Sequence, residues 1–329
     1  MSGMDDLIKQ VVELIRNKSP IDALNYILSN CPDEVKEKAR QLFDNPDVIK
    51  TLDEKWANLL YLIYYAHISF YASQLTSRQG IAGQAVSSLT AAKLSRRLNI
   101  PQLEAIFLIY GAKALNLMGM RDRAEICYLK AEEILREICK NDESYLKELS
   151  DVLNDLGIIY VEQNDRSKGE RYLKEALEIR RKLVERDKSI LPLLAQTLNN
   201  LASLYKDMKK FGEADEYFAE AEKIYRELVK EDESYIVDLA VVLCNYASLY
   251  KILKEYEKSE ALYKEALRIF EKLTEKDVFY NSGVADVLMY LSNLYREMGK
   301  IEEAEEYMKK ANEVFNQLVA KMQKQTETS

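Results

Sequence analysis

Apolar and polar positions along the chain follow a short period and a long one. Within single stretches, apolar residues recur about four positions apart, as Leu7, Val11 and Ile15 do in Asp5–Ile15. This is the spacing of one face of an α-helix. Over longer distances a pattern that is clearest as TLNNLASLY recurs every 45 residues and ends each time at a tyrosine: Tyr160, Tyr205, Tyr250 and Tyr295. A fixed period of this length predicts a stack of repeated helical units.

A second periodic pattern follows each of these stretches and predicts the partner helix of a pair. Small residues stand seven positions apart with a large residue between them, which lets two helices approach closely. The complete sets are Ala124/Tyr128/Ala131, Ala214/Phe218/Ala221 and Ala304/Met308/Ala311, with Gly169/Leu173/Ala176 and Ser259/Tyr263/Ala266 as variants. Each unit then ends at an aspartate, which we expect to cap the following helix: Asp142, Asp187, Asp232 and Asp277. The last helix is expected to end near Val319–Lys321.

The first part of the chain is helical but follows the long period poorly. Ser19-Pro20, Cys31-Pro32 and Asn45-Pro46 have the composition of helix starts, with a cap residue or proline at the first helical position. A long apolar helix is expected over about 52–75 and a second over about 81–98. We therefore predict three regions: residues 1–98 with a degenerate repeat, residues 99–321 with about five regular helix pairs, and a frayed tail at 322–329.

The repeated residues resemble those of the tetratricopeptide repeat. The leucine, small residue and tyrosine of that family's first helix match Leu156/Gly157/Tyr160, Leu201/Ala202/Tyr205, Tyr246/Ala247/Tyr250 and Leu291/Ser292/Tyr295. The usual unit is about 34 residues, and the longer unit here looks most like the repeats of kinesin light chains. The resemblance implies an all-α, right-handed helical-repeat solenoid. The family's turn glycine stands at Gly119 and Gly299, but Asn164, Lys209 and Lys254 replace it in the other units.

In this family the first helix of each pair lines a concave groove, so the resemblance also implies where binding residues stand. We call the following ten positions the groove face: Asn199, Asn200, Ser203, Lys206, Asn245, Ser248, Lys251, Tyr290, Asn293 and Arg296. An asparagine amide can both donate to and accept from a peptide backbone. The basic side chains favour an acidic partner. The expected function is a protein–protein interaction scaffold that binds an extended, acidic segment of another protein.

Two other interpretations remain open at this point. The basic row can be a solvated helix face, and the asparagines can reflect repeat duplication alone. The array can also be a self-associating or autoinhibited structural scaffold whose groove is filled by residues 1–98 or by the tail. The clamp for acidic chaperone C-termini is not expected, because Asn154, Ile158, Asn199 and Ser203 stand at its matching positions.

Composition narrows the class of protein further. Only 10 glycines and 5 prolines in 329 residues argue against an all-β fold. A net charge of −8 disfavours a nucleic-acid partner. The four cysteines show no CxxC spacing, and the start of the chain has no signal-peptide pattern, so we expect a reducing, cytoplasmic location.

Candidate chemistry is sparse. The single histidine, His67, stands in an apolar stretch and is expected to be a core residue rather than a catalyst. No phosphate-binding loop, GxSxG or metal-ligand cluster is present in the sequence, so we expect neither enzymatic activity nor a cofactor. The uncharged stretch Trp56–Leu75 has the length of a membrane span, but its polar residues favour a buried helix and no membrane partner.

Overall fold

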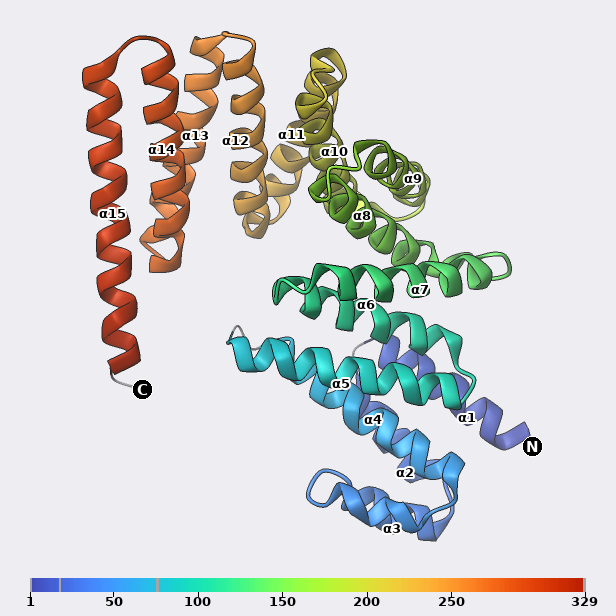
Figure 1. Ribbon diagram of the computed structural model, residues 1–329. Coiled ribbons are helices and arrows are strands. Elements are labelled where there is room, and N and C mark those ends of the chain that lie inside the picture. Colours follow the sequence, from blue (N-terminus) through green and yellow to red (C-terminus); the bar gives the residue numbers. More distant parts are fainter. Residues whose placement is uncertain (1, 18, 75–76, 328–329) are drawn as a thin grey trace. The chain divides into compact units, whose positions relative to one another are not determined.

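The computed structural model describes residues 2–17, 19–74 and 77–327, and its regular elements there are all helical (Figure 1). The all-α helical-repeat architecture predicted from the 45-residue period is therefore confirmed. The chain divides into two compact units, Met1–Ala176 and Leu177–Ser329. The division falls inside one helix and follows compactness, so the expected boundary near residue 98 stays a prediction.

The first unit contains the degenerate region and the first regular pairs. Its elements are α1 (Ser2–Arg16), α2 (Pro20–Asn30), α3 (Asp33–Arg40), η1 (Pro46–Thr51), α4 (Glu54–Ala72), α5 (Arg78–Arg97), α6 (Pro101–Leu117), α7 (Arg121–Cys139), η2 (Glu143–Tyr145), α8 (Leu146–Glu162) and the start of α9 (Arg166–Val184). Helices α4/α5 and α6/α7 pack as pairs. The return helix α5 begins at Arg78, three residues before the expected start, because Ser77 accepts a hydrogen bond from the Gly80 N–H and caps it.

The second unit consists of regular pairs. Its elements are the end of α9, then η3 (Lys188–Ile190), α10 (Leu191–Asp207), α11 (Phe211–Glu231), η4 (Glu233–Tyr235), α12 (Ile236–Ile252), α13 (Tyr256–Thr274), η5 (Val278–Tyr280), α14 (Asn281–Glu297) and α15 (Ile301–Glu327). Helices α14 and α15 lie side by side and antiparallel (Figure 1). The last helix continues to Glu327 instead of ending near residues 319–321, since its final turns contain good helix formers and neither glycine nor proline.

The small-residue pattern makes the close contact between paired helices, as expected. Every member of the complete and variant sets is buried, except that Met308 of the last helix is half-buried. Two of the small residues also bond across the contact. The Ser259 hydroxyl donates to the Ala247 carbonyl at 2.8 Å, and the Ser292 hydroxyl donates to the Ala304 carbonyl at 2.7 Å. These bonds require that the two backbones lie almost in contact.

The repeating tyrosines are packing residues with one polar end. Tyr160 stacks on Tyr172 with ring centroids 5.4 Å apart, and its hydroxyl donates to Glu125 at 2.8 Å. In the second unit the Tyr295 hydroxyl donates in the same way to Glu260 at 2.6 Å. The phenol therefore joins a first helix to the second helix of the preceding pair, which phenylalanine could not do.

The periodic aspartates cap a different element from the one expected. Asp142, Asp187, Asp232 and Asp277 each accept a hydrogen bond from the backbone N–H two residues later, at 2.8–3.0 Å. They therefore begin the short 3-10 turns η2 to η5. Each α-helix begins directly after its three-residue turn. The short side chain of aspartate reaches only the nearest N–H groups, and these belong to the turn.

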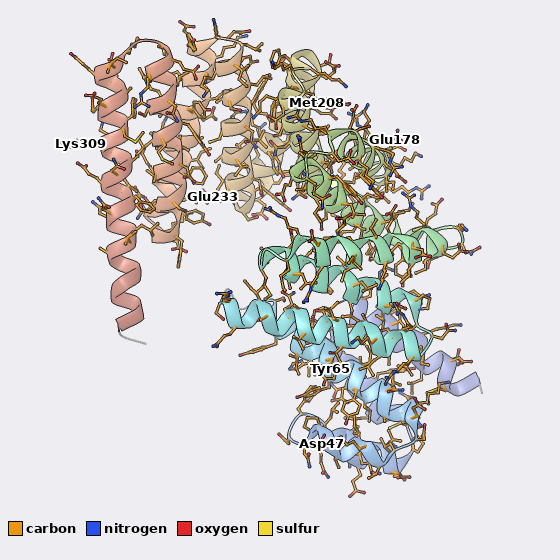
Figure 2. All side chains as sticks on the ribbon, viewed as in Figure 1. Asp47, Tyr65, Glu178, Met208, Glu233 and Lys309 are labelled. Atoms are coloured by element: carbon orange, nitrogen blue, oxygen red, sulfur yellow. The ribbon has the colours of Figure 1, made fainter. Side chains whose placement is uncertain are left out.

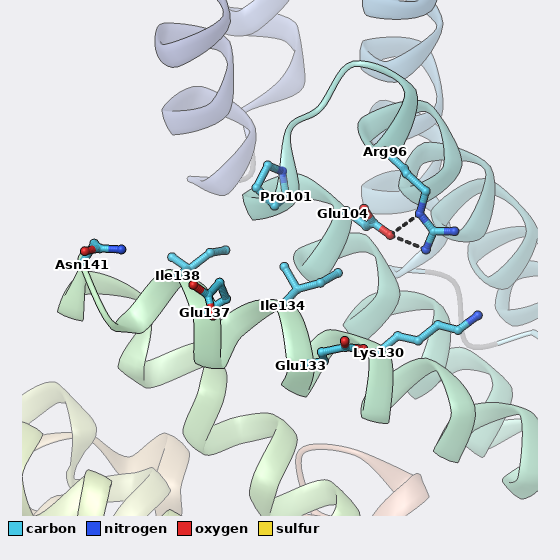
Figure 3. Close-up of a pocket in the computed structure, with 9 residues that line it drawn as sticks. All are labelled: Arg96, Pro101, Glu104, Lys130, Glu133, Ile134, Glu137, Ile138 and Asn141. Carbon is cyan, nitrogen blue, oxygen red and sulfur yellow. Dashed lines mark hydrogen bonds and ion pairs between the residues drawn. The ribbon is translucent and has the colours of Figure 1, made fainter.

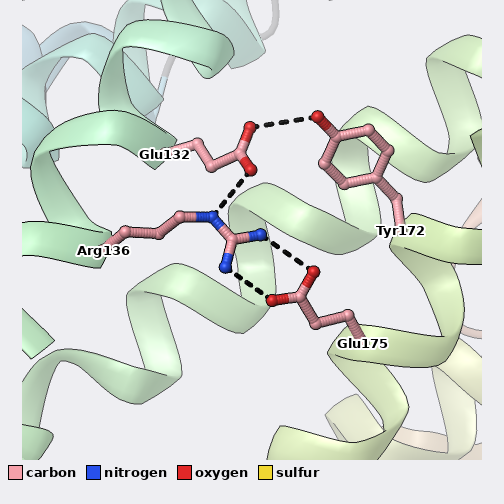
Figure 4. Close-up of polar contacts among 4 residues, drawn as sticks. All are labelled: Glu132, Arg136, Tyr172 and Glu175. Carbon is pink, nitrogen blue, oxygen red and sulfur yellow. Dashed lines mark hydrogen bonds and ion pairs between the residues drawn. The ribbon is translucent and has the colours of Figure 1, made fainter.

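Charged side chains form a ladder across consecutive second helices, and Figure 4 shows its first step, around Arg136. Arg136 of α7 donates to both carboxylate oxygens of Glu175 of α9, at 2.6 and 2.8 Å, and its Nε donates to Glu132. One period later, in the second unit, Arg181 bonds Glu220. Two periods later, Arg226 bonds Glu265 at 2.7 and 2.9 Å. Other charged residues on these helices, such as Glu178 and Lys309, are exposed (Figure 2). Each partly exposed bridge contributes about 1 kcal/mol or less, so the ladder mainly orients the helices.

The apolar helix α4 packs with one face buried against its neighbours, as expected for Trp56–Leu75, of which Leu75 lies outside the described part. Its Ser69 is buried and bonds Ser88 of α5 at 2.7 Å. Within the described residues one segment, Glu233–Ile252, is long and apolar enough by composition to cross a membrane. That segment includes α12, which packs against α11 and α13, and 44% of it is buried inside the protein.

The turns between paired helices contain residues in the left-handed region of φ. Gly119 and Gly299 have φ of 76° and 77°, and Asn164, Lys209 and Lys254 have φ of 64°, 60° and 60°. Left-handed backbone costs a non-glycine residue about 1–2 kcal/mol. The two lysines therefore strain the turns that the family usually builds with glycine.

We predict that Lys209→Gly stabilises the protein by about 1 kcal/mol, because glycine adopts positive φ without a Cβ clash. Chemical and thermal unfolding of the purified chain measure the change. Lys209→Ala is the matched control: it removes the same charge but keeps the Cβ, and it should give no comparable gain. Equal stabilisation by both variants would contradict the strain at this turn.

Candidate functional site

The ten groove-face residues lie on three first helices of the second unit. Helix α10 presents Asn199, Asn200, Ser203 and Lys206, helix α12 presents Asn245, Ser248 and Lys251, and helix α14 presents Tyr290, Asn293 and Arg296. Helices α10 and α12 are in contact. The residues on these two helices are half-buried, and those on α14 are exposed. None of the ten lies in the packed core, so all remain candidates for contact with a partner.

An amide pair joins two of these helices. The Nδ2 of Asn245 donates to the Oδ1 of Asn199 at 3.1 Å. A carboxamide carries two N–H donors and an oxygen with two acceptor sites. The bond between Asn245 and Asn199 uses one donor and one acceptor site of the pair. The bond fixes the orientation of both amides on the groove face.

Lys206 is a half-buried cation on this face whose hydrogen-bond partner is a hydroxyl rather than a carboxylate. Its ammonium donates to the Ser248 hydroxyl at 2.7 Å, and that hydroxyl donates to the Asn245 carbonyl at 2.7 Å. No ion pair joins Lys206 to a carboxylate within the part of the chain that the structure describes. Burial lowers the pKa of Lys206. The carboxylate of Asp207 partly opposes this shift, and Lys251 adds a smaller lowering.

The other two basic residues differ from Lys206. Lys251 forms an ion pair with Glu297 of α14 at 3.3 Å, so part of its charge is already compensated. Arg296 is exposed at the end of α14. The sequence pattern placed the three cations in one row but missed Glu297. The available signal was that Glu297 stands 46 positions after Lys251, which places it on the neighbouring helix.

A small cavity of about 130 Å³ opens between α12 and α14, beside the amide pair. It is lined by Val241, Cys244, Asn245, Phe270, Gly283, Asp286, Val287 and Tyr290. Asn245 and Tyr290 were predicted as groove residues. The other six were not, because no motif marks them.

A larger cavity lies elsewhere, between α6 and α7 in the first unit (Figure 3). It measures about 620 Å³ and contains an ion pair in which Arg96 bonds the buried Glu104 at 2.7 Å. Its floor residues Ile134 and Ile138 correspond in the repeat to Ile224 and Leu228, which line a cavity of about 370 Å³. Similar cavities at the open ends of other helix pairs show that this space belongs to the repeat geometry.

Residues suited to catalysis are scattered. Within the described residues no group of three or more His, Cys, Asp or Glu side chains is arranged to hold a metal ion. His67 is half-buried with its ring centroid 4.8 Å from that of Phe43. All four cysteines are free thiols.

The N-terminal helix α1 is tied to the start of α8 within the first unit. Arg16 donates to Glu148 at 3.0 Å and to the Ser144 hydroxyl at 3.1 Å, and its guanidinium lies 4.0 Å from the centroid of the Tyr145 ring. Glu148 stands seven residues, or two helical turns, before Asp155, which is the counterpart of Asn200 in the repeat. Helix α1 therefore contacts the N-terminal end of α8, on the side of α8 that carries Asp155.

Residues 148–227 and 238–317 match the tetratricopeptide repeat family. Among solved structures, the chain is similar to BtubC (BKLC) from P. vanneervenii, at 21% identity over 72% of this chain and 92% of that one, with a TM-score of 0.58. It is also similar to aspartyl phosphate phosphatase F from Bacillus subtilis, at 15% identity over 94% and 93% of the chains, with a TM-score of 0.58.

A Rap protein complexed with Competence and Sporulation Factor is similar at 17% identity over 97% of this chain and 78% of that one, with a TM-score of 0.59. At these identities the likeness shows the fold, a helical-repeat solenoid. No curated protein matches the chain in sequence.

We predict that Lys206→Met raises the melting temperature near neutral pH, and that this gain shrinks as the pH rises toward about 10.4, the pKa of an unfolded lysine. Burial lowers the folded pKa of Lys206, so the unfolded chain binds more protons and stability rises with pH in this range. Melting of both proteins between neutral and alkaline pH measures the difference. A gain that does not change with pH would contradict a Lys206 ammonium whose pKa is lowered by burial.

Proposed function

We propose that this chain, a tetratricopeptide-repeat protein, is an interaction scaffold that binds an extended segment of another protein on the groove face of α10, α12 and α14. The observation that carries the proposal is the amide pair Asn199–Asn245, which bridges neighbouring first helices and keeps unused hydrogen-bonding capacity. We further propose that this binding is cytoplasmic and that the scaffold is not an enzyme. Its contribution is affinity and positioning.

The amides suit a peptide backbone because they offer donors and acceptors without requiring a particular side chain. A backbone in extended conformation exposes N–H and C=O groups alternately along its length. Repeats that place like residues along one face match such a ligand one unit at a time. Asn245 is the central residue of this arrangement, since it bonds Asn199 through its side chain and Ser248 through its carbonyl.

The charge of the site supports an acidic segment. Lys206 has a hydroxyl partner but no carboxylate partner in the described structure, so a carboxylate or phosphate on the ligand would compensate it. Arg296 is exposed and adds positive charge on α14. Lys251 contributes less, because Glu297 competes for its ammonium. We therefore assign the preference for acid mainly to Lys206.

The comparison structures support a binding role in general terms. The similar Rap protein is solved with Competence and Sporulation Factor bound, so a helical-repeat protein of this fold holds a partner molecule. Another similar structure is named a phosphatase. We do not extend that activity to this chain, because 15% identity shows the fold alone.

A second candidate function is an autoinhibited scaffold. The observation in its favour is the bond network of Arg16, which fixes the N-terminal helix α1 to Ser144, Tyr145 and Glu148. In this case removal of residues 1–98 would strengthen partner binding. The contact lies in the first unit, whereas the amide pair and Lys206 lie in the second, and for this reason we place peptide binding first.

We predict that Asn200→Ala combined with Asn245→Ala weakens partner binding by at least about tenfold, because two or more hydrogen bonds of about 1 kcal/mol each are lost. The partner is first captured with the wild-type chain, and its bound segment is mapped and measured by calorimetry. The matched control is Asn312→Ala with Gln317→Ala, two exposed amides on α15. Unchanged affinity in the Asn200/Asn245 variant, with its melting temperature preserved, would exclude the groove face as the binding site.

We also predict that affinity for the mapped segment falls as ionic strength rises from about 0.01 M to about 1 M, where the Debye length shortens from about 30 to about 3 Å. Lys206→Gln should flatten this dependence. Lys254→Gln is the control, because Lys254 lies exposed in a helix turn away from the groove face. Equal salt dependence in all three proteins would show that Lys206 does not meet a negative charge.

A further inference from the structure

The cavity between α12 and α14 has an apolar floor and an open mouth. Phe270 is buried beneath it, with Cys244 and Val287 at its sides. At the mouth, Val241 is 44% exposed and Tyr290 is 41% exposed. Exposed apolar side chains around a hollow are what a binding pocket for an apolar group presents before it is filled.

The cavity exists because two residues are smaller here than at the same positions one repeat earlier. Cys244 takes the position of Asn199, and Gly283 takes the position of Asp238. Between α10 and α12 the larger Asn199 side chain crosses to Asn245 and bonds it. Between α12 and α14 the thiol and the glycine leave that volume empty. The cavity is thus a local departure from the repeat, unlike the larger cavities at the open ends of the pairs.

Gly283 is required for the shape of the floor. A Cβ at this position would lie 2.6 Å from the Phe270 ring, which is closer than two carbon atoms can approach. Glycine in a helix is less favourable than alanine by about 1 kcal/mol. The chain accepts this residue in the first turn of α14, and the Phe270 ring lies against it.

The rim is polar on one side. Asn245, which belongs to the amide pair, lines the cavity, and the exposed Asp286 lies on α14. Burial raises the pKa of the Cys244 thiol to about 12, so the sulfur stays neutral and behaves as an apolar group. An apolar side chain inserted here would bring its own backbone next to the Asn245 amide.

We propose that this cavity is a specificity pocket for one aliphatic side chain of leucine or methionine size, on the segment whose backbone the asparagines bind. The pocket deepens the proposed function and rests on it. Its volume of about 130 Å³ suits a single side chain, since an engineered cavity of about 150 Å³ binds one benzene molecule. The partner segment then carries an acidic residue for Lys206 and an aliphatic residue for the pocket.

The spacing of these two ligand residues follows from the helix geometry. Ser248, which holds the Lys206 ammonium, stands three residues after Asn245 on the same helix, or about 4.5 Å along its axis. Neighbouring helices lie about 8–10 Å apart. An extended chain covers about 3.3 Å per residue, so the acidic and aliphatic residues should be about two to four positions apart.

The test uses capped single amino acids, so it does not depend on knowing the partner. N-acetyl-leucine-methylamide is titrated into the full chain with labelled valine methyl groups, and the signals of Val241 and Val287 are followed by NMR. We expect saturable shifts at these two methyl groups, with the alanine analogue binding about tenfold more weakly or worse. Cys244→Leu, which fills the cavity, should abolish the shifts. Gln196→Leu, at the position equivalent to Val241 on α10, should leave them unchanged.

Each outcome decides the proposal. Equal binding of the leucine and alanine probes by the wild-type chain overturns the aliphatic pocket even if Cys244→Leu fails to fold. The same holds if a third probe, N-acetyl-lysine-methylamide, binds more strongly than the leucine probe through Asp286. If the leucine probe binds as expected but no partner segment competes with it, the pocket stands and the proposed function fails. If a mapped segment binds with equal affinity to wild type and to folded Cys244→Leu, the function stands and the pocket does not.

Discussion

Close approach of paired helices at small residues is the constraint on which the rest of the structure depends. Alanine, glycine or serine stands at each contact, and the serines of two units donate to carbonyls of the facing helix. Contacts this short leave no room for larger side chains, so each pair can form in only one register. Once the register is set, the tyrosine hydroxyls and the arginine–glutamate ladder bring their partners within bonding distance.

The same constraint determines which side chains are available for binding. A first helix packs with one stripe of its surface, which includes Leu201, Ala202 and Tyr205, and these residues are buried. The opposite stripe carries Asn199, Ser203 and Lys206, which packing leaves half-buried. Because neighbouring first helices lie side by side, polar residues on them can bond across the gap, and this produces the amide pair and the Lys206–Ser248 bond. The groove face is therefore partly preorganised by its own hydrogen bonds.

Departures from the repeat are more informative about specificity than the repeat itself. The cavity between α6 and α7 is larger than the one beside Asn245, but a similar cavity stands between α10 and α11, so it belongs to the repeat. The cavity beside Asn245 is smaller and arises from Cys244 and Gly283, which break the pattern of the preceding unit. A turn lysine such as Lys209 is another departure, and it affects stability rather than binding.

The sequence by itself determined the fold class, the helix pairs, the buried small-residue sets and the helix faces that carry Asn245 and Lys206. These follow from periodicity, because a residue's position in a helical repeat sets which face it occupies. Only the tertiary structure decided the pairings. In the structure Asn245 donates a hydrogen bond to Asn199, and Lys251 forms an ion pair with Glu297. The periodic aspartates cap 3-10 turns. These contacts depend on the distance and rotation between neighbouring helices, and packing across the whole repeat sets both.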